Sequence, residues 1–465
     1  MTRRPVSMTR RQLLAALGTA AGAVAGSAAL GGCSNAAARW GFSGNPDSAK
    51  ANLTYALWDT YQQEGYQKSI DQFTAKHPDI SVTIQQIPYG NYAPKITASF
   101  ISGNAPDLFW VNTPFLADWI RQGIIADVTD RVRAANIDTS VYVEGLVELH
   151  EREGKLYGLP KDWDTICFYY NKSYFQKLGV SAPTEQLEWN PDDGGTFLKF
   201  LRTITSDSKG KTADQPGFDP GDIVTYAVGN TNDPQSGYGS YLPMNGGAFI
   251  AEPYAARTVL DTAPNRETIS FLSQMLVDEH VQIPYGELGP NADGSSALTL
   301  FAQGRLALFQ AGDWNTSSIS ELTSNFEVGT FLLPRGPQGG WTVFNGLTDG
   351  TSTATEHPEQ TWLLAEWLGG ADSQRIMGSG GYIWPAIESL DPLYAEHWKK
   401  NKVDVSAFLT AAQGKKSLYP VAVGMAEAVS DVQTALAPTF FGTASAATGL
   451  AKAQQVADYR ISSGA

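Results

Sequence analysis

The chain has 465 residues, of which 42% are hydrophobic and 17% charged, a balance typical of a folded globular protein and not of a disordered one. Its formal net charge of −14 at pH 7 disfavours nucleic acid and anionic membrane surfaces as partners. The length exceeds what one hydrophobic core supports, so we expect two domains.

Residues 1–32 have the pattern of an export signal, in which arginines precede an apolar run and a small-residue processing site. That site, Leu30–Cys33, resembles the lipobox of bacterial lipoproteins, whose cysteine is lipidated and becomes the new N-terminus. The segment Thr9–Leu14 is similar to a twin-arginine export signal. The alternative is an uncleaved transmembrane anchor, because the apolar run is near the lower length limit for a span. Residues 33–50 are small and polar, which predicts a flexible tether.

The segment after the tether alternates between the two periodicities of regular structure. Strand patterns occur at 53–58, 80–84 and 107–111, and apolar residues recur at helical spacing over 66–73 and 96–100. The last strand is a continuous apolar run of the kind buried in a parallel sheet. Strand–helix–strand–helix–strand predicts right-handed crossovers and a three-layer α/β lobe.

A second α/β region follows. Residues 165–170 form another apolar strand, in which we expect Cys167 to be a buried, inert thiol. Residues 181–245 are rich in Asp, Gly, Pro and Ser and predict loops at a lobe surface. Amphipathic helices are predicted near 269–276 and 358–369, and an Ala-rich helical region follows to the C-terminus.

Four segments carry a resemblance to a known family. They are Asn104–Asn112 with its Ala-Pro-Asp start, Gly154–Pro160, Phe301–Trp314, and Gln374–Ala386 with its Trp-Pro-Ala end. In this order they are similar to the bacterial extracellular solute-binding proteins that deliver sugars to ABC importers, the maltodextrin-binding type in particular. Cys167 and the loop-rich stretch 181–245 depart from the pattern.

The resemblance implies an α/β, two-lobed periplasmic-binding-protein-like fold of type II, with a ligand cleft between lobes joined by hinge crossovers. Ligands of open α/β sheets bind at the carboxyl ends of strands, which is where this cleft is expected. The resemblance divides the chain into an N-terminal lobe, residues 51–150 and 335–383, and a C-terminal lobe, residues 151–334 and 384–465.

Aromatic side chains beside acids or amides suit a sugar, because rings stack on its C–H faces while carboxylates and amides accept its hydroxyls. Several of the twelve tryptophans lie beside acids at predicted strand ends. The alternative role of Asp59 and Asp164 is to cap the helices that follow. The candidate ligand-binding residues are Trp58, Asp59, Asn112, Thr113, Asp162, Trp163, Asp164, Asn245, Gly246, Asp313, Trp314, Asn345, Tyr382 and Trp384.

The expected function is therefore a monomeric binding component of an ABC transporter that captures a di- or oligosaccharide and delivers it to the permease. We expect it to be held at the outer face of the cell membrane by a lipid on Cys33, without metal or cofactor. The alternative is an exported glycoside hydrolase or another carbohydrate-active lipoprotein. No acid pair stands out for hydrolysis, and His150-Glu151 lacks the second histidine of a zinc helix.

Overall fold

The computed structural model describes residues 50–229, 232–288, 294–323 and 325–464. The predicted signal, Cys33 and the tether up to residue 49 lie outside these residues. Within the described ranges, no helix is long and apolar enough to cross a membrane.

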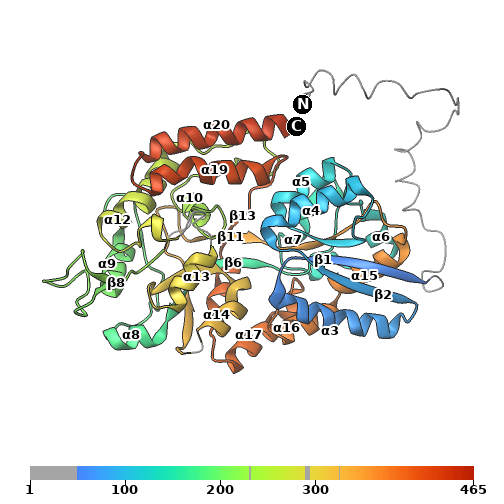
Figure 1. Cartoon of the computed structure of the whole chain (residues 1–465), viewed down its shortest axis with the longest axis horizontal. Coiled ribbons are helices and arrows are strands. Elements are labelled where there is room, and N and C mark those ends of the chain that lie inside the picture. Colours follow the sequence, from blue (N-terminus) through green and yellow to red (C-terminus); the bar gives the residue numbers. More distant parts are fainter. Residues whose placement is uncertain (1–49, 230–231, 289–293, 324, 465) are drawn as a thin grey trace, which may run out of the picture. The chain divides into compact units, whose positions relative to one another are not determined.

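The first sheet has the strand order β12-β3-β1-β2. Strand β1 (Ala51–Leu57) is parallel to both β2 (Ile80–Gln86) and β3 (Leu108–Val111), as the apolar runs predicted. The strand β12 (Thr348–Thr351) comes from much later in the chain and is antiparallel to β3. We call this sheet, with the helices that cover it, the N-terminal lobe (Figure 1).

Helices of the N-terminal lobe follow from the predicted spacing. In α3 (Thr60–Lys76), Tyr66, Ile70 and Phe73 are buried on one face, and the helix ends before Pro78. The other helices of this part of the chain are α4 (Tyr89–Ser102), α5 (Thr113–Arg121), α6 (Thr129–Ala134), α7 (Leu146–Leu149), α15 (Pro358–Gly369) and α16 (Ala371–Ser379).

The second sheet is built around β6 (Asp164–Asn171), which is antiparallel to β9 (Leu308–Gly312), β10 (Val328–Phe331) and β11 (Trp341–Asn345). Strand β13 (Lys415–Leu418) adds to β11 in parallel. This sheet and its helices form the C-terminal lobe (Figure 1). Cys167 is a buried free thiol in β6, as expected, and burial raises its pKa well above the usual range.

The remaining elements surround this sheet or connect the lobes. The long helices α19 (Met425–Phe440) and α20 (Ala446–Gly464) lie side by side (Figure 1). The helices are α8 (Lys172–Leu178), α9 (Gly195–Ile204), α10 (Tyr241–Met244), α11 (Ala263–Ser270), α12 (Leu276–Asp278), α13 (Gly294–Ala302), α14 (Thr316–Leu322), α17 (Asp391–Lys400), α18 (Ser406–Ala412), α19 (Met425–Phe440) and α20 (Ala446–Gly464). The short strands are β4 (Glu151–Arg152), β5 (Lys155–Leu156), β7 (Ser206–Asp207) and β8 (Ile223–Thr225).

Three segments cross between the lobes and are joined by backbone hydrogen bonds. The Lys161 amide donates to the Leu347 carbonyl at 3.1 Å, and the Trp163 amide donates to the Trp384 carbonyl at 3.2 Å. Ala386 in turn donates to the Lys161 carbonyl at 3.3 Å.

The lobe boundary expected at residue 335 differs from the observed strand placement. Strand β11 pairs with β6 and β13, so Trp341–Asn345 belongs to the second sheet, and the crossing comes at the following two residues. The boundary near residue 335 was placed from the family resemblance. In the structure the glycines and prolines there make a tight turn between β10 and β11, with Gly336 bridged to Gly339.

Candidate ligand-binding site

A cavity of about 1200 Å³ is lined by residues of both lobes and of the crossing segments. Trp58 and Asp59 follow β1, and Asn112 follows β3, so the carboxyl ends of neighbouring parallel strands contribute its N-terminal side. Of the residues predicted from the sequence, the cavity brings together Trp58, Asp59, Asn112, Asp162, Trp163, Asp164, Asp313, Trp314, Asn345, Tyr382 and Trp384.

The other predicted residues do not line this cavity. Thr113 lies behind its wall, where the hydroxyl donates to Asn345 Oδ1 at 2.5 Å. Asn245 and Gly246 lie elsewhere, since the Asn245 amide donates to Glu267 at 2.9 Å and Gly246 has a φ of 83°. The two residues end α10: Asn245 is the C-cap, and Gly246 adopts the left-handed conformation that commonly follows a helix C-terminus.

The tryptophans fall into two groups. Trp58 and Trp314 are partly exposed, one from each lobe. A Cβ at position 312 would overlap the Trp314 ring, so Gly312 allows that ring to lie against the backbone. Trp163 is 1% exposed and Trp384 0%, with ring centroids 4.6 Å apart. The second pair therefore forms a packed floor and offers little free face for stacking.

The neighbouring rings extend the exposed aromatic surface around Trp58. Its ring centroid lies 5.3 Å from that of Tyr89 and 4.7 Å from that of Trp110, both edge to face. Tyr89 also lines the cavity, whereas Trp110 is fully buried behind it. Tyr382 lines the cavity as a partly exposed side chain.

The carboxylates of the cavity are held by backbone and amide groups. Asp59 caps α3, accepting from the amides of Tyr61 and Gln62, so the alternative role weighed for it is correct. Asp164 caps no helix, because it begins β6 and accepts from Gln235 Nε2 at 3.0 Å.

Asp162 and Asp313 accept hydrogen bonds from backbone amides of a crossing segment and of β6, respectively. Asp162 accepts from the Leu347 amide at 2.7 Å, and Asp313 accepts from the Thr165 amide at 3.1 Å. Burial raises the pKa of Asp162 to about 6, an effect that Lys161 opposes. Burial and the charge of Asp162 raise the pKa of Asp164, and burial and the charge of Asp164 raise that of Asp313.

The family model of the bacterial extracellular solute-binding proteins matches residues 59–375. The chain belongs to this family. A putative binding protein of Brucella abortus is 22% identical over 85% of this chain and 89% of its own length. The arabinooligosaccharide-binding protein of Bacillus subtilis is 23% identical over 56% of this chain and 57% of its own.

Solved structures agree with the two-lobed fold. UspC of Mycobacterium tuberculosis is 27% identical, with a TM-score of 0.72 over 88% of this chain and 99% of that chain. The substrate-binding protein Lmo0181 of Listeria monocytogenes, solved with cycloalternan, is 19% identical, with a TM-score of 0.75 over 88% of this chain and 98% of that chain. Family and relatives are binding proteins rather than enzymes.

Several residues that line the cavity of this solute-binding protein were not predicted. Gln235 and Ser236 come from the loop-rich stretch 181–245, which therefore contributes to the cavity wall. Glu427, Ser430 and Gln433 come from α19. Their spacing of three places them on one helix face, and polar residues recurring at that period in an Ala-rich helix are a signal that could have identified them.

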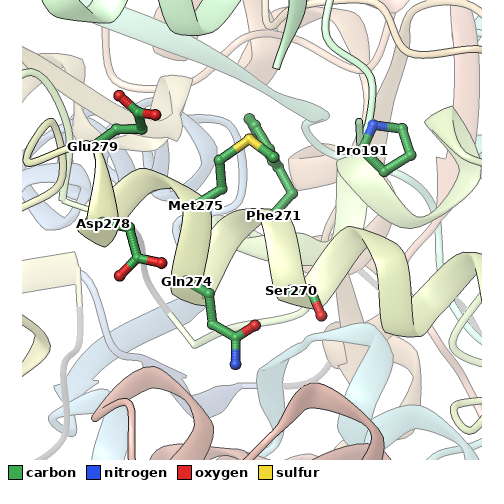
Figure 2. A pocket seen from close by; sticks show the side chains of 7 residues that line it. All are labelled: Pro191, Ser270, Phe271, Gln274, Met275, Asp278 and Glu279. Atoms are coloured by element: carbon green, nitrogen blue, oxygen red, sulfur yellow. The ribbon is translucent and has the colours of Figure 1, made fainter. Parts of the chain in front are cut away.

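A second hollow, of about 310 Å³, lies on the C-terminal lobe of the solute-binding protein. Figure 2 shows its side chains projecting from the helical segment Ser270–Glu279, with Pro191 on the other side. The segment includes a π-helical turn at Phe271–Met275. Glu279 is already paired with Arg202 at 2.5 Å, and none of the predicted ligand-binding residues lines this hollow.

The raised pKa of Asp162 predicts how the ligand-free protein responds to pH. The native carboxyl keeps its proton up to about pH 6, whereas the reference value is 3.8, so the native state binds more protons in that window. The contribution of Asp162 to the free energy of unfolding is therefore fully present below pH 3.8, and it is lost as the pH rises through about 6. In wild-type protein this lowers the free energy of unfolding by up to about 1.4 kcal/mol per pH unit, and Asp162→Asn should abolish that decrease in urea unfolding between pH 4 and 7.

The matched control for this variant is Glu396→Gln, an exposed carboxyl of α17, which should leave the pH profile unchanged. An Asp162→Asn profile that coincides with the wild type at every pH would contradict the prediction.

Proposed function

We propose that this solute-binding protein captures a di- or oligosaccharide in the cavity between its lobes and presents it to the permease of an ABC importer. The observation that carries the proposal is the pairing of partly exposed Trp58 and Trp314, one from each lobe, with the carboxylates of the same cavity. Rings stack on the C–H faces of a sugar, and the carboxylates accept its hydroxyls.

The size of the cavity and the relatives support a ligand longer than a monosaccharide. A volume of about 1200 Å³ exceeds the usual range of small-molecule pockets. Relatives are named as binding arabinooligosaccharides, galactooligosaccharides and maltodextrin. Among the solved relatives, one holds cycloalternan and another holds mannotriose.

Capture follows from ligand contacts on both sides of the crossing segments. A glycan that touches Trp58 and Trp314 together stabilises the arrangement in which the lobes are closest. The population of that state can shift only by the difference between the ligand's affinities for the closed and open states. The permease then recognises the closed form.

The test is a thermal-shift panel of mono-, di- and oligosaccharides on the purified protein, followed by calorimetry on every ligand that raises the melting temperature. We expect reversible binding of at least one glycan, compaction in solution scattering and no cleavage products. Binding with steady release of shortened sugars would favour the hydrolase instead. No shift with any glycan would overturn the proposal.

We also propose that the exported protein is anchored to the outer face of the cell membrane through a lipid on Cys33. Support comes from the Leu30–Cys33 processing site and from the extracellular family. Cys33→Ser should move the protein from the membrane fraction to the medium or periplasm, because it removes the only thiol that the site offers for acylation. Detergent-phase partition of cell fractions measures this, and Cys167→Ser, at a buried residue, is the control. Retention of the Cys33→Ser protein in the membrane would contradict lipidation.

A further inference from the structure

The cavity described above has charge of one sign only. Among the described residues that line it, six side chains are acidic and none is Lys, Arg or His. The acids are Asp59, Asp162, Asp164, Asp233, Asp313 and Glu427. They come from the end of β1, a crossing segment, both lobes and α19, so the negative charge surrounds the space and is not confined to one loop.

The cation closest in sequence is directed away from this space. Lys161 is fully buried, with Nζ 3.4 Å from Asp349 Oδ1 and 3.7 Å from the centre of the Trp110 ring. Its charge offsets part of that of Asp162, but it does not line the cavity. A ligand therefore meets acceptors and negative charge without a protein cation at the surface.

A buried acceptor of the cavity wall also lacks a donor. Gln62 lines the cavity and is 7% exposed, and its Oε1 finds no hydrogen-bond partner among the described residues. An unpaired buried acceptor costs free energy, so this atom favours a ligand that supplies a proton donor. The observation is independent of the charges, and it is met by a hydroxyl or an ammonium group alike.

Three of the acids interact electrostatically with one another, which places their carboxyls in one part of the cavity. Asp162 and Asp164 are two residues apart along the chain, and Asp313 accepts from the amide of the residue that follows Asp164. Burial raises the pKa of all three carboxyls, and the charge of Asp162 adds to this at Asp164, as does that of Asp164 at Asp313. A bound cation would reverse this repulsion.

We propose that the ligand is an amino sugar or a glycan containing one, whose ammonium group is bound at Asp162, Asp164 and Asp313. An ammonium offers three donors and one positive charge, which matches clustered carboxylates better than hydroxyls do. The inference rests on the proposed capture of a glycan and adds the chemistry by which that glycan is chosen. It disfavours uronic acids and sugar phosphates, whose negative charge would face the six acids.

The test uses pairs of ligands that differ only in the amino group. Glucosamine, galactosamine, mannosamine and the glucosamine disaccharide are compared by calorimetry with glucose, galactose, mannose, cellobiose and the N-acetylated forms. We expect the amino member of at least one pair to bind at least tenfold more tightly than its neutral and acetylated partners. Asp164→Asn should reduce that ratio, whereas Glu396→Gln, exposed on α17, should not.

The outcomes separate this inference from the proposed function. If neutral glycans bind as tightly as their amino partners in every pair, the inference is overturned while glycan capture stands. Tighter binding of acidic sugars than of amino sugars would also overturn the inference and leave glycan capture standing. If no sugar of any kind binds, both fall. The ligand pairs on the wild-type protein decide the matter even if Asp164→Asn fails to fold.

Discussion

Replacing Lys161 by methionine is expected to lower the free energy of unfolding by about 3–5 kcal/mol. The ammonium group is fully buried, 3.4 Å from Asp349 Oδ1, and also donates to the Tyr55 hydroxyl at 3.4 Å. Asp349 accepts a second bond from that hydroxyl, at 2.9 Å. Methionine keeps most of the side-chain volume, so the main effect is an uncompensated carboxylate in the core.

Urea unfolding at pH 7 measures the loss. The double variant Lys161→Met, Asp349→Leu should recover much of it, since removing both charges removes the unpaired one. Lys155→Met is the matched control, because that exposed lysine is 3.6 Å from Asp127 and surface pairs contribute only about 0–1 kcal/mol. A single variant as stable as the wild type would mean that Asp349 needs no partner.

Replacing Trp314 by alanine is expected to weaken glycan binding by about tenfold or more, equivalent to about 1.4 kcal/mol. The ring is partly exposed in the cavity, where an aromatic stack contributes about 0.5–1.5 kcal/mol beyond the area it buries. Trp58→Ala should have a similar effect from the other lobe. Calorimetry with the tightest glycan of the panel measures both.

The control for these variants is Trp341→Ala. Trp341 is also partly exposed but lies outside the cavity, with its indole donating to the Gln338 carbonyl at 3.3 Å. Its removal should leave the affinity unchanged. If Trp314→Ala and Trp58→Ala both bind as the wild type does, the cavity is not the place where the glycan stacks.

The position of the cavity could be predicted where local sequence and topology coincide. Trp58-Asp59 and Asn112 directly follow strands β1 and β3, and parallel neighbours bring their carboxyl ends to one edge. Asn245-Gly246 has residue types equally suited to a sugar but ends a helix. Nothing within a few residues distinguishes a helix end from a cleft loop, so the sequence did not reveal that these two residues lie outside the cavity.

Burial was the other property that local sequence could not provide. Trp163 lies between two acids in the sequence, so it was predicted to contact ligand as Trp58 does. In the structure its indole donates to Asp391 at 3.2 Å, and Trp384 packs on it. Asp391 belongs to α17, more than two hundred residues later in the chain. For Trp163→Ala we therefore expect a loss of packing, of about 3–5 kcal/mol, to mask any effect on affinity.

The late arrival of β12 has a consequence for synthesis. Tyr55 and Asp349 are 294 residues apart, and the edge of β3 stays open until residues 348–351 have been made. Such a contact order predicts slow folding, because loop-closure entropy must be met before the pairing stabilises anything. A nascent chain with an exposed apolar strand edge is prone to aggregate. We therefore expect the sheet of the N-terminal lobe to be completed only after residue 351 has been made.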